Sequence, residues 1–145
     1  MQKFITFILN RITGLLFITI FVFSSISLLS RSSNDPYYGH YVTNENINNF
    51  FGSMGSYFAG TVYIFLGTSS YLISIFFLIL GFKKIFGIQI KLILIRLTSF
   101  IVSIILLCFI FKYWSFNGGV LGNILFEIIN NQLENVFINK YAFFI

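Results

Sequence analysis

The chain has 145 residues, a formal net charge of +5 and the composition of a protein that is surrounded by lipid. Hydrophobic residues make up 57% of it and aromatic residues 21%, only 9% are charged, and the mean hydropathy is +0.90. Soluble domains carry about 25% charged residues, so this chain has too few charges to cover a surface in water. The composition therefore argues against a soluble enzyme domain, a disordered tail and a secreted disulfide scaffold.

Three apolar runs, over residues 12–29, 59–82 and 92–111, are each close to the length that crosses a bilayer as a helix, about 20 residues. A cleaved signal peptide is the alternative for the first run, but the apolar stretch is longer than the usual 7–15 residues or so. Arg96 lies one turn inside the third run, and we expect its long side chain to reach the interface beside Lys91. The sequence therefore predicts three transmembrane helices.

The remainder of the chain predicts two further segments. Residues 120–137 alternate apolar and polar positions at helical spacing, which predicts an amphipathic helix that is too polar to span and lies in the interface or caps the bundle. Residues 136–145 are apolar again but too few to cross a bilayer, so we expect the truncated start of a fourth span, with a half-inserted anchor as the alternative. The predicted fold class is all-α: a polytopic helical membrane protein forming one domain over residues 1–145.

Positive residues in short loops orient a membrane protein. Placing the N-terminus and the loop 83–91 in the cytoplasm puts six of the nine Lys and Arg residues on that side. The predicted topology is therefore N-in, with residues 30–56 and 113–135 outside. The residues expected to anchor the helices at the two interfaces are Arg11, Lys83, Lys84, Arg96, Tyr113 and Trp114. His40, in the outer loop, is expected to be a solvated loop residue.

Two clusters of small residues lie beside the predicted spans. The first consists of Gly52, Gly55, Ser56, Ala59 and Gly60. Small residues at this spacing let helix backbones approach closely, which predicts a helix-packing face. The second cluster consists of Gly118, Gly119 and Gly122. Glycine tolerates backbone conformations that other residues avoid, so we predict that this cluster forms the turn before the amphipathic helix.

Sequence patterns of catalysis and metal binding are missing from the chain. It has no phosphate-binding glycine loop and no zinc motif, and one histidine, one cysteine and four carboxylates do not make a catalytic triad. We therefore expect no enzyme activity, no cofactor and no direct contact with nucleic acid.

Cys108 lies in an apolar run and is expected to be a small buried hydrophobe. The only candidates for the polar path of a channel or carrier are Ser69, Ser70, Ser74, Thr98, Ser99 and Ser103. Interhelical hydrogen bonding is the favoured interpretation of these hydroxyls.

Several short motifs follow one another in an order that resembles a known family. They are R-x-x-G-L-L from Arg11, Asp35-Pro36, N-x-x-G-x-x-G-S-Y-x-A from Asn49, Gly81-Phe82-Lys83, and G-G-x-x-G from Gly118. Over about residues 11–145 the chain resembles the N-terminal four-helix membrane domain of FtsK-type bacterial DNA translocases.

This resemblance implies a membrane anchor and oligomerisation module of a DNA translocase at the division septum. In that family the membrane domain lies in the bacterial inner membrane, has both ends in the cytoplasm, engages other division proteins and is joined to a hexameric motor. The implied partners are therefore the lipid bilayer, further copies of this chain and division-site membrane proteins, in cell division and chromosome segregation. The alternatives are a stand-alone small membrane protein with an accessory or division role and, less favoured, a small channel or carrier.

Overall fold

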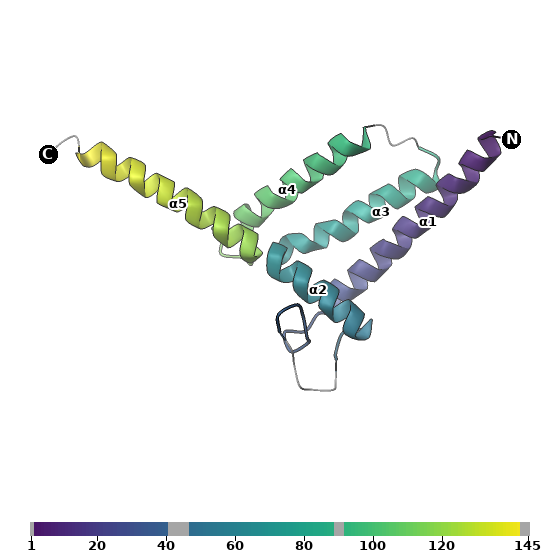
Figure 1. Cartoon of the computed structure of the whole chain (residues 1–145), viewed down its shortest axis with the longest axis horizontal. Coiled ribbons are helices and arrows are strands. Elements are labelled where there is room, and N and C mark those ends of the chain that lie inside the picture. The colour runs from purple at the N-terminus through teal and green to yellow at the C-terminus, as the bar shows by residue number, and fades with distance from the viewer. Residues whose placement is uncertain (1, 41–46, 89–91, 143–145) are drawn as a thin grey trace.

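The chain is helical throughout its regular structure over residues 2–40, 47–88 and 92–142, which a computed structural model describes (Figure 1). The elements are α1 (Gln2–Leu29), α2 (Gly52–Leu66), the 3₁₀-helix η1 (Gly67–Ser70), α3 (Tyr71–Ile85), α4 (Ile93–Tyr113) and α5 (Gly119–Ala142). Three stretches, Phe4–Leu29, Gly52–Ile85 and Ile93–Tyr113, are long and apolar enough to cross a membrane. The structure therefore confirms the predicted class, a helical membrane protein with three spans.

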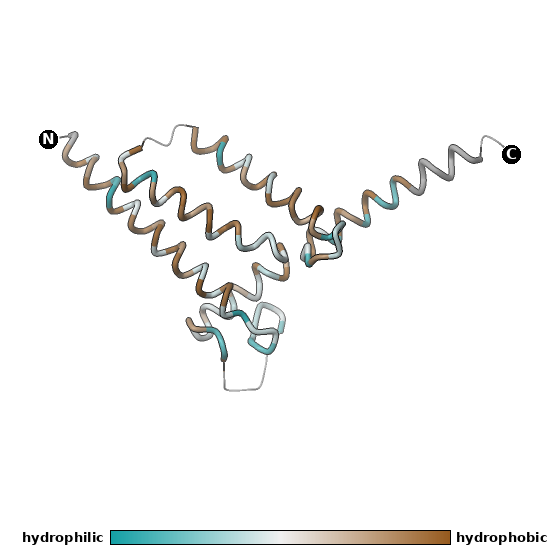
Figure 2. Tube along the Cα trace, turned by 180° about the vertical axis from the view of Figure 1, so that it is seen from behind, coloured by the Kyte–Doolittle hydropathy of each residue, from teal (hydrophilic) through white to brown (hydrophobic). Residues whose placement is uncertain are grey.

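Helices α1 and α3 lie side by side and antiparallel, and α4 follows beyond α3 (Figures 1 and 2). We call one end of this bundle the loop end, because residues 30–40 and 47–51 lie there together with the α4–α5 connection. The opposite, N-terminal end carries the start of α1 and the end of α3. Helix α2 lies at the loop end, where it contacts α1 and α5, and α5 then projects away from the bundle (Figure 1).

The interior of the described chain contains many small polar residues, whereas many large apolar residues lie on its surface. The buried polar residues of the described chain are Ser24, Ser27, Asp35, Asn49, Ser56, Ser69, Ser70 and Ser74. The buried hydrophobic residues are Leu28, Ala59, Leu80, Ile104 and Cys108. Large apolar side chains are instead exposed along the helices, which are apolar along most of their length (Figure 2). Such a surface is stable only in contact with lipid tails, so the burial pattern supports the membrane assignment independently of helix length.

The predicted second span, residues 59–82, is not one straight helix. Helix α2 ends at Leu66, η1 follows, and α3 leaves in a different direction (Figure 1). Gly67 stands at the break with a φ of +57°, which favours glycine, and its N–H donates to the carbonyl of Tyr63. The predicted span lies within the apolar stretch Gly52–Ile85, but this stretch contains a break that was not predicted. The run is apolar on both sides of the break. Hydropathy therefore gives no sign of the kink.

The amphipathic helix predicted over 120–137 and the fourth span predicted over 136–145 belong to a single helix, α5. No glycine or proline occurs between Asn123 and Ala142, so nothing in the sequence ends the helix between the two predicted segments. Gly119 and Gly122 are buried, whereas the side chains of both polar and apolar character from Glu127 to Leu133 are exposed. Residues 143–145 of the predicted fourth span lie outside the described residues. Helix α5 thus packs against α4 and α2 at its start, where the rings of Phe109 and Phe126 lie 6.5 Å apart, and is uncovered from Glu127 to Leu133 in the described chain.

The contact between α1 and α3 depends on two glycines that face each other. An added Cβ on Gly14 would lie 2.9 Å from the backbone nitrogen of Ile85, and one on Gly81 would lie 3.2 Å from the carbonyl oxygen of Gly14. Real Cβ atoms essentially never come within 3.0 Å of another heavy atom, and a contact of 3.2 Å is also tighter than most, so the two backbones meet directly. Next to them the rings of Phe17 and Phe77 lie 6.0 Å apart. Close approach of this kind replaces the hydrophobic force that is missing between helices in lipid.

We predict that Gly14→Leu separates α1 from α3 and lowers the free energy of unfolding by about 1–3 kcal/mol, the usual cost of overpacking. Thr13→Leu is the matched control, because Thr13 is exposed and its hydroxyl bonds only to carbonyls of its own helix. The measurement is the thermal unfolding midpoint of both variants in detergent. Equal midpoints for Gly14→Leu and Thr13→Leu would contradict the close approach of the two helices.

Candidate functional site

The predicted helix-packing face is covered by the chain's own loop. An added Cβ on Gly55 would lie 2.7 Å from the Cβ of Phe51, and one on Gly60 would lie 2.5 Å from the Cβ of Tyr37. The hydroxyl of Ser56 donates to the carbonyl of Pro36. Ala59 is fully buried in the same stretch, whereas a Cβ on Gly52, at the start of α2 with a φ of +58°, would meet open space. Gly55, Ser56 and Gly60 therefore contact the loop, and a helix-packing role for the whole set of small residues stays a prediction.

Asn49 and Asp35 hold that loop in place with side-chain hydrogen bonds. The Nδ2 of Asn49 donates to the carbonyl of Ser27 at 2.8 Å, while its Oδ1 accepts from the backbone N–H of Phe51 at 3.1 Å. The Oδ1 of Asp35 accepts from the N–H of Asn48 at 2.8 Å. Both side chains are buried, so losing either would leave polar groups without partners.

His40 and Tyr37 close a short turn on the outside of the loop. Their backbones exchange hydrogen bonds of 3.2 and 2.9 Å, and their rings stack at 4.9 Å. His40 is exposed. This position agrees with the expectation of a solvated loop histidine.

The second glycine cluster does more than form a turn. Gly119 has a φ of +66°, and an added Cβ on it would lie 2.5 Å from the backbone nitrogen of Gly67. Gly118 and Gly122 lie against the carbonyl of Cys108, leaving no room for a side chain. We call Gly67, Gly118, Gly119 and Gly122 the glycine junction. It joins the kink after α2 to the backbones of α4 and α5.

Two hydrogen bonds close the glycine junction. The N–H of Thr68 donates to the carbonyl of Asn117 at 2.8 Å, and the Sγ of Cys108 lies 3.3 Å from the carbonyl oxygen of Leu66. Cys108 has no exposed surface, as expected for a small buried residue. The sequence offered no sign that Gly67, within an apolar run, would meet a segment 50 residues away.

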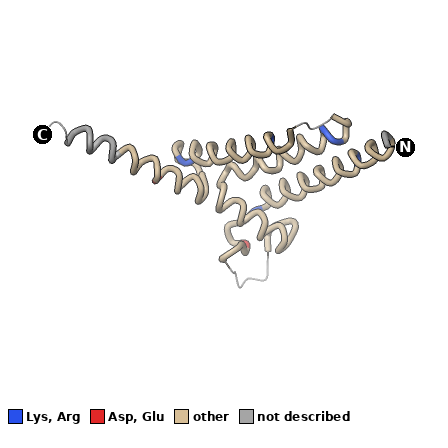
Figure 3. Tube along the Cα trace, turned by 45° about the horizontal axis from the view of Figure 1, so that its top comes forward, with Lys and Arg blue, Asp and Glu red and all other residues tan. Residues whose placement is uncertain are grey.

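The predicted interface residues lie toward the two ends of the helices. Arg11, Lys83, Lys84 and Arg96 belong to the parts of α1, α3 and α4 near the N-terminal end, and Figure 3 shows the basic positions of these helices. The Nζ of Lys84 donates to the Oδ1 of Asn10 at 3.3 Å, which ties α3 to α1. Tyr113 and Trp114 are exposed at the loop end of α4.

The hydroxyls proposed for a polar path differ in burial. Ser69, Ser70 and Ser74 are buried at and after the kink, whereas Thr98, Ser99 and Ser103 are exposed on α4. The hydroxyls of Thr98 and Ser103 donate to carbonyls of their own helix, at 3.0 and 2.8 Å. The interhelical bonds expected of these two α4 hydroxyls are therefore not formed.

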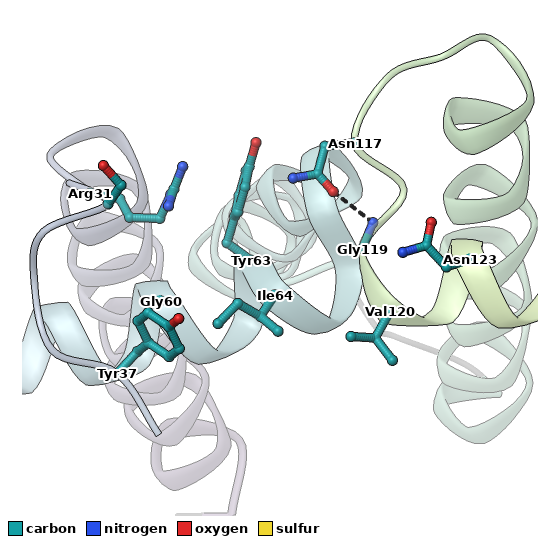
Figure 4. A pocket seen from close by; sticks show the side chains of 10 residues that line it. Arg31, Tyr37, Gly60, Tyr63, Ile64, Asn117, Gly119, Val120 and Asn123 are labelled. Atoms are coloured by element: carbon teal, nitrogen blue, oxygen red, sulfur yellow. Dashed lines mark hydrogen bonds between the residues drawn. The ribbon is translucent and has the colours of Figure 1, made fainter. Parts of the chain in front are cut away.

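A cleft of about 400 Å³, with a lining of mixed polar and apolar character, opens at the loop end between α2 and α5 (Figure 4). It is lined by Arg31, Ser33, Tyr37, Gly60, Tyr63, Ile64, Asn117, Gly119, Val120 and Asn123. The guanidinium carbon of Arg31 lies 3.8 Å from the centroid of the Tyr63 ring. No group of three His, Cys, Asp or Glu side chains that could hold a metal ion occurs in the described part of the chain. The cleft is a candidate binding site.

Comparison with known proteins decides the family. The family model of the 4TM region of the DNA translocases FtsK and SpoIIIE matches residues 8–138. This chain belongs to that family. The match confirms the resemblance seen in the ordered motifs, and it includes the glycine junction and every residue that lines the cleft. Comparison with the curated proteins and with the solved structures gave no match.

We predict that Gly67→Ala opens the glycine junction of this 4TM region, because the new Cβ would overlap the carbonyl of Asn117. Cys108, the only cysteine, is a built-in reporter. Its labelling by a maleimide in detergent should rise severalfold when the segment at 117–119 moves away.

Gly87→Ala is the matched control for this experiment. Gly87 also has a positive φ, of +70°, but nothing lies within 4 Å of its added Cβ. This variant carries the same backbone strain without a clash, so Cys108 should stay protected. Labelling that remains at the wild-type level in Gly67→Ala, although full in denaturing detergent, would refute the junction.

Proposed function

We propose that this chain anchors an FtsK/SpoIIIE-type DNA translocase in the bacterial inner membrane at the division septum, where it serves cell division and chromosome segregation. The observation that carries the proposal is the family match over residues 8–138 on a chain whose apolar helices face outward. The segment itself is not catalytic in this proposal, since the motor and the DNA-reading parts of the family lie in other domains. Its direct contacts are with lipid and with membrane proteins of the division site.

The orientation proposed for the anchor is N-terminus in the cytoplasm. Its support is the charge distribution: Arg11, Lys83, Lys84 and Arg96 belong to the N-terminal end, while Arg31 and Lys112 belong to the loop end. The cytoplasmic side of a membrane protein carries the excess of Lys and Arg in short loops. The N-terminal end would then face the cytoplasm.

Oligomerisation is a further part of the proposal, since the motor of the family is hexameric. The loop already covers Gly55, Ser56 and Gly60, so we place the contact between copies elsewhere on the helices. Exposed apolar side chains on α4 and α5, such as Ile101 and Ile124, remain available to further copies or to lipid.

Localisation of the native protein tests the septal role. A fluorescent protein fused to the N-terminus at the native locus should accumulate at midcell in dividing cells, and the signal should remain in the membrane after salt washing. The control is a fusion to an unrelated helical membrane protein of similar size, which should be spread around the cell. An even distribution of the fusion along the membrane would contradict the septal proposal and favour an accessory membrane protein.

A further inference from the structure

The cleft at the loop end presents hydrogen-bond donors from two sides. Arg31 and Tyr63 stand on one wall, and Asn117 and Asn123 on the other (Figure 4). None of the described residues that line it is acidic. A lining that is basic and rich in amide and hydroxyl donors is complementary to an anion with several acceptor oxygens.

Arg31 is held in a position that suits this role. Its guanidinium stacks on Tyr63 at 3.8 Å, which occupies the flat face of the group and leaves its N–H edges available for in-plane bonds. No carboxylate of the described chain lies within ion-pair distance of it. The Oδ1 of the buried Asp35 accepts from the N–H of Asn48 instead, and its Oδ2 has no hydrogen-bond partner among the described residues. A counter-ion for Arg31 would therefore have to come from outside the described chain.

Asn117 is oriented by the start of α5. Its Oδ1 accepts from the N–H of Gly119 at 2.9 Å, which fixes the amide so that the Nδ2 lies on the side facing Tyr63 (Figure 4). Asn123 also has its amide nitrogen on that side (Figure 4). Gly119 and Val120, the first residues of α5, line the cleft as well, and the positive end of the helix dipole adds to the attraction for an anion.

The surroundings of the cleft favour a lipid over a free ion. Tyr113, Trp114 and Phe116 are exposed just before Asn117, and exposed aromatic rings of this kind lie at the level of lipid headgroups. Ile64 and Val120 add apolar surface to the lining, and Ile124 continues it along the exposed side of α5. An amphiphile with a phosphate head and an apolar chain fits both parts. We propose that the cleft binds the phosphate headgroup of an anionic phospholipid in the leaflet at the loop end.

The test is native mass spectrometry of the full chain, released from nanodiscs that contain equal parts of phosphatidylglycerol and phosphatidylcholine. The wild-type chain should retain phosphatidylglycerol in preference to phosphatidylcholine. Arg31→Gln should reduce this preference about tenfold, since a hydrogen bond to a charged group is worth that much or more. Arg11→Gln is the matched control: Arg11 also stacks on a ring, that of Phe7 at 4.8 Å, but lies on α1 toward the N-terminal end. The Arg11→Gln variant should prefer phosphatidylglycerol as strongly as the wild-type chain does.

A second variant keeps the proposal testable if Arg31→Gln does not fold. Asn123 is exposed, so Asn123→Asp should fold normally while placing a negative charge on the wall opposite Arg31. It should also abolish the preference. A preference that persists in Asn123→Asp, or that Arg11→Gln abolishes equally, would overturn the proposal.

Inorganic phosphate distinguishes a lipid headgroup from a free anion. We expect no rise in the thermal midpoint of the delipidated chain on adding phosphate at millimolar concentration, and a clear rise on adding phosphatidylglycerol. A rise with phosphate alone that Arg31→Gln removes, with none for the lipid, would assign the cleft to a soluble anion and overturn the lipid part of the proposal.

Discussion

The arrangement of the helices depends on the direct contact between two backbones at the glycine junction. In lipid, apolar side chains gain little by leaving the solvent for one another, so helices associate through close packing and hydrogen bonds. Gly67 and Gly119 meet without side chains between them, and Thr68 bonds to Asn117 across the contact. Helices α4 and α5 are joined to the rest of the molecule largely here. The stacked rings of Phe76 and Phe100, 4.0 Å apart, provide a second tie between α3 and α4.

The same principle explains why the inside of the molecule is small and polar. Gly14 and Gly81 bring α1 against α3, and serines fill the narrow space that remains between helices. At the loop end, Gly55 and Gly60 admit the loop, and Asn49 anchors it to the end of α1. The loop in turn places Arg31 and Tyr37 beside α2, and the glycine junction places Asn117 opposite them. Close packing of backbones at glycines thus determines both the arrangement of the helices and the position of the cleft.

The sequence predicted the features that a bilayer imposes on any chain. The apolar runs located the three spans because each must match the thickness of the hydrocarbon core. The burial of Cys108 followed from its apolar neighbours. The break at Gly67 could not be predicted, because its cause is a contact with the segment around Asn117, far away in the chain. Hydropathy is a local property and carries no sign of such a contact.

Long-range contacts also explain what was missed at the candidate site. Gly60 was recognised as a packing residue, but its partner is Tyr37 of the loop rather than another helix. Gly14 and Gly81 were noted only as parts of motifs, since nothing in either motif says that the two face each other. The cleft combines residues from Arg31 to Asn123, drawn from the loop, α2 and the start of α5, so only the folded chain reveals it.

The central claim is that this chain is the membrane domain of a DNA translocase of the FtsK/SpoIIIE family. The most direct measurement is an immunoblot of fractionated native cells, with an antibody raised against residues 34–49. The account predicts a band in the membrane fraction several times heavier than the 16.7 kDa of this chain, because the family joins this region to a motor. A single membrane band near 16.7 kDa would contradict it and leave a stand-alone membrane protein as the better account.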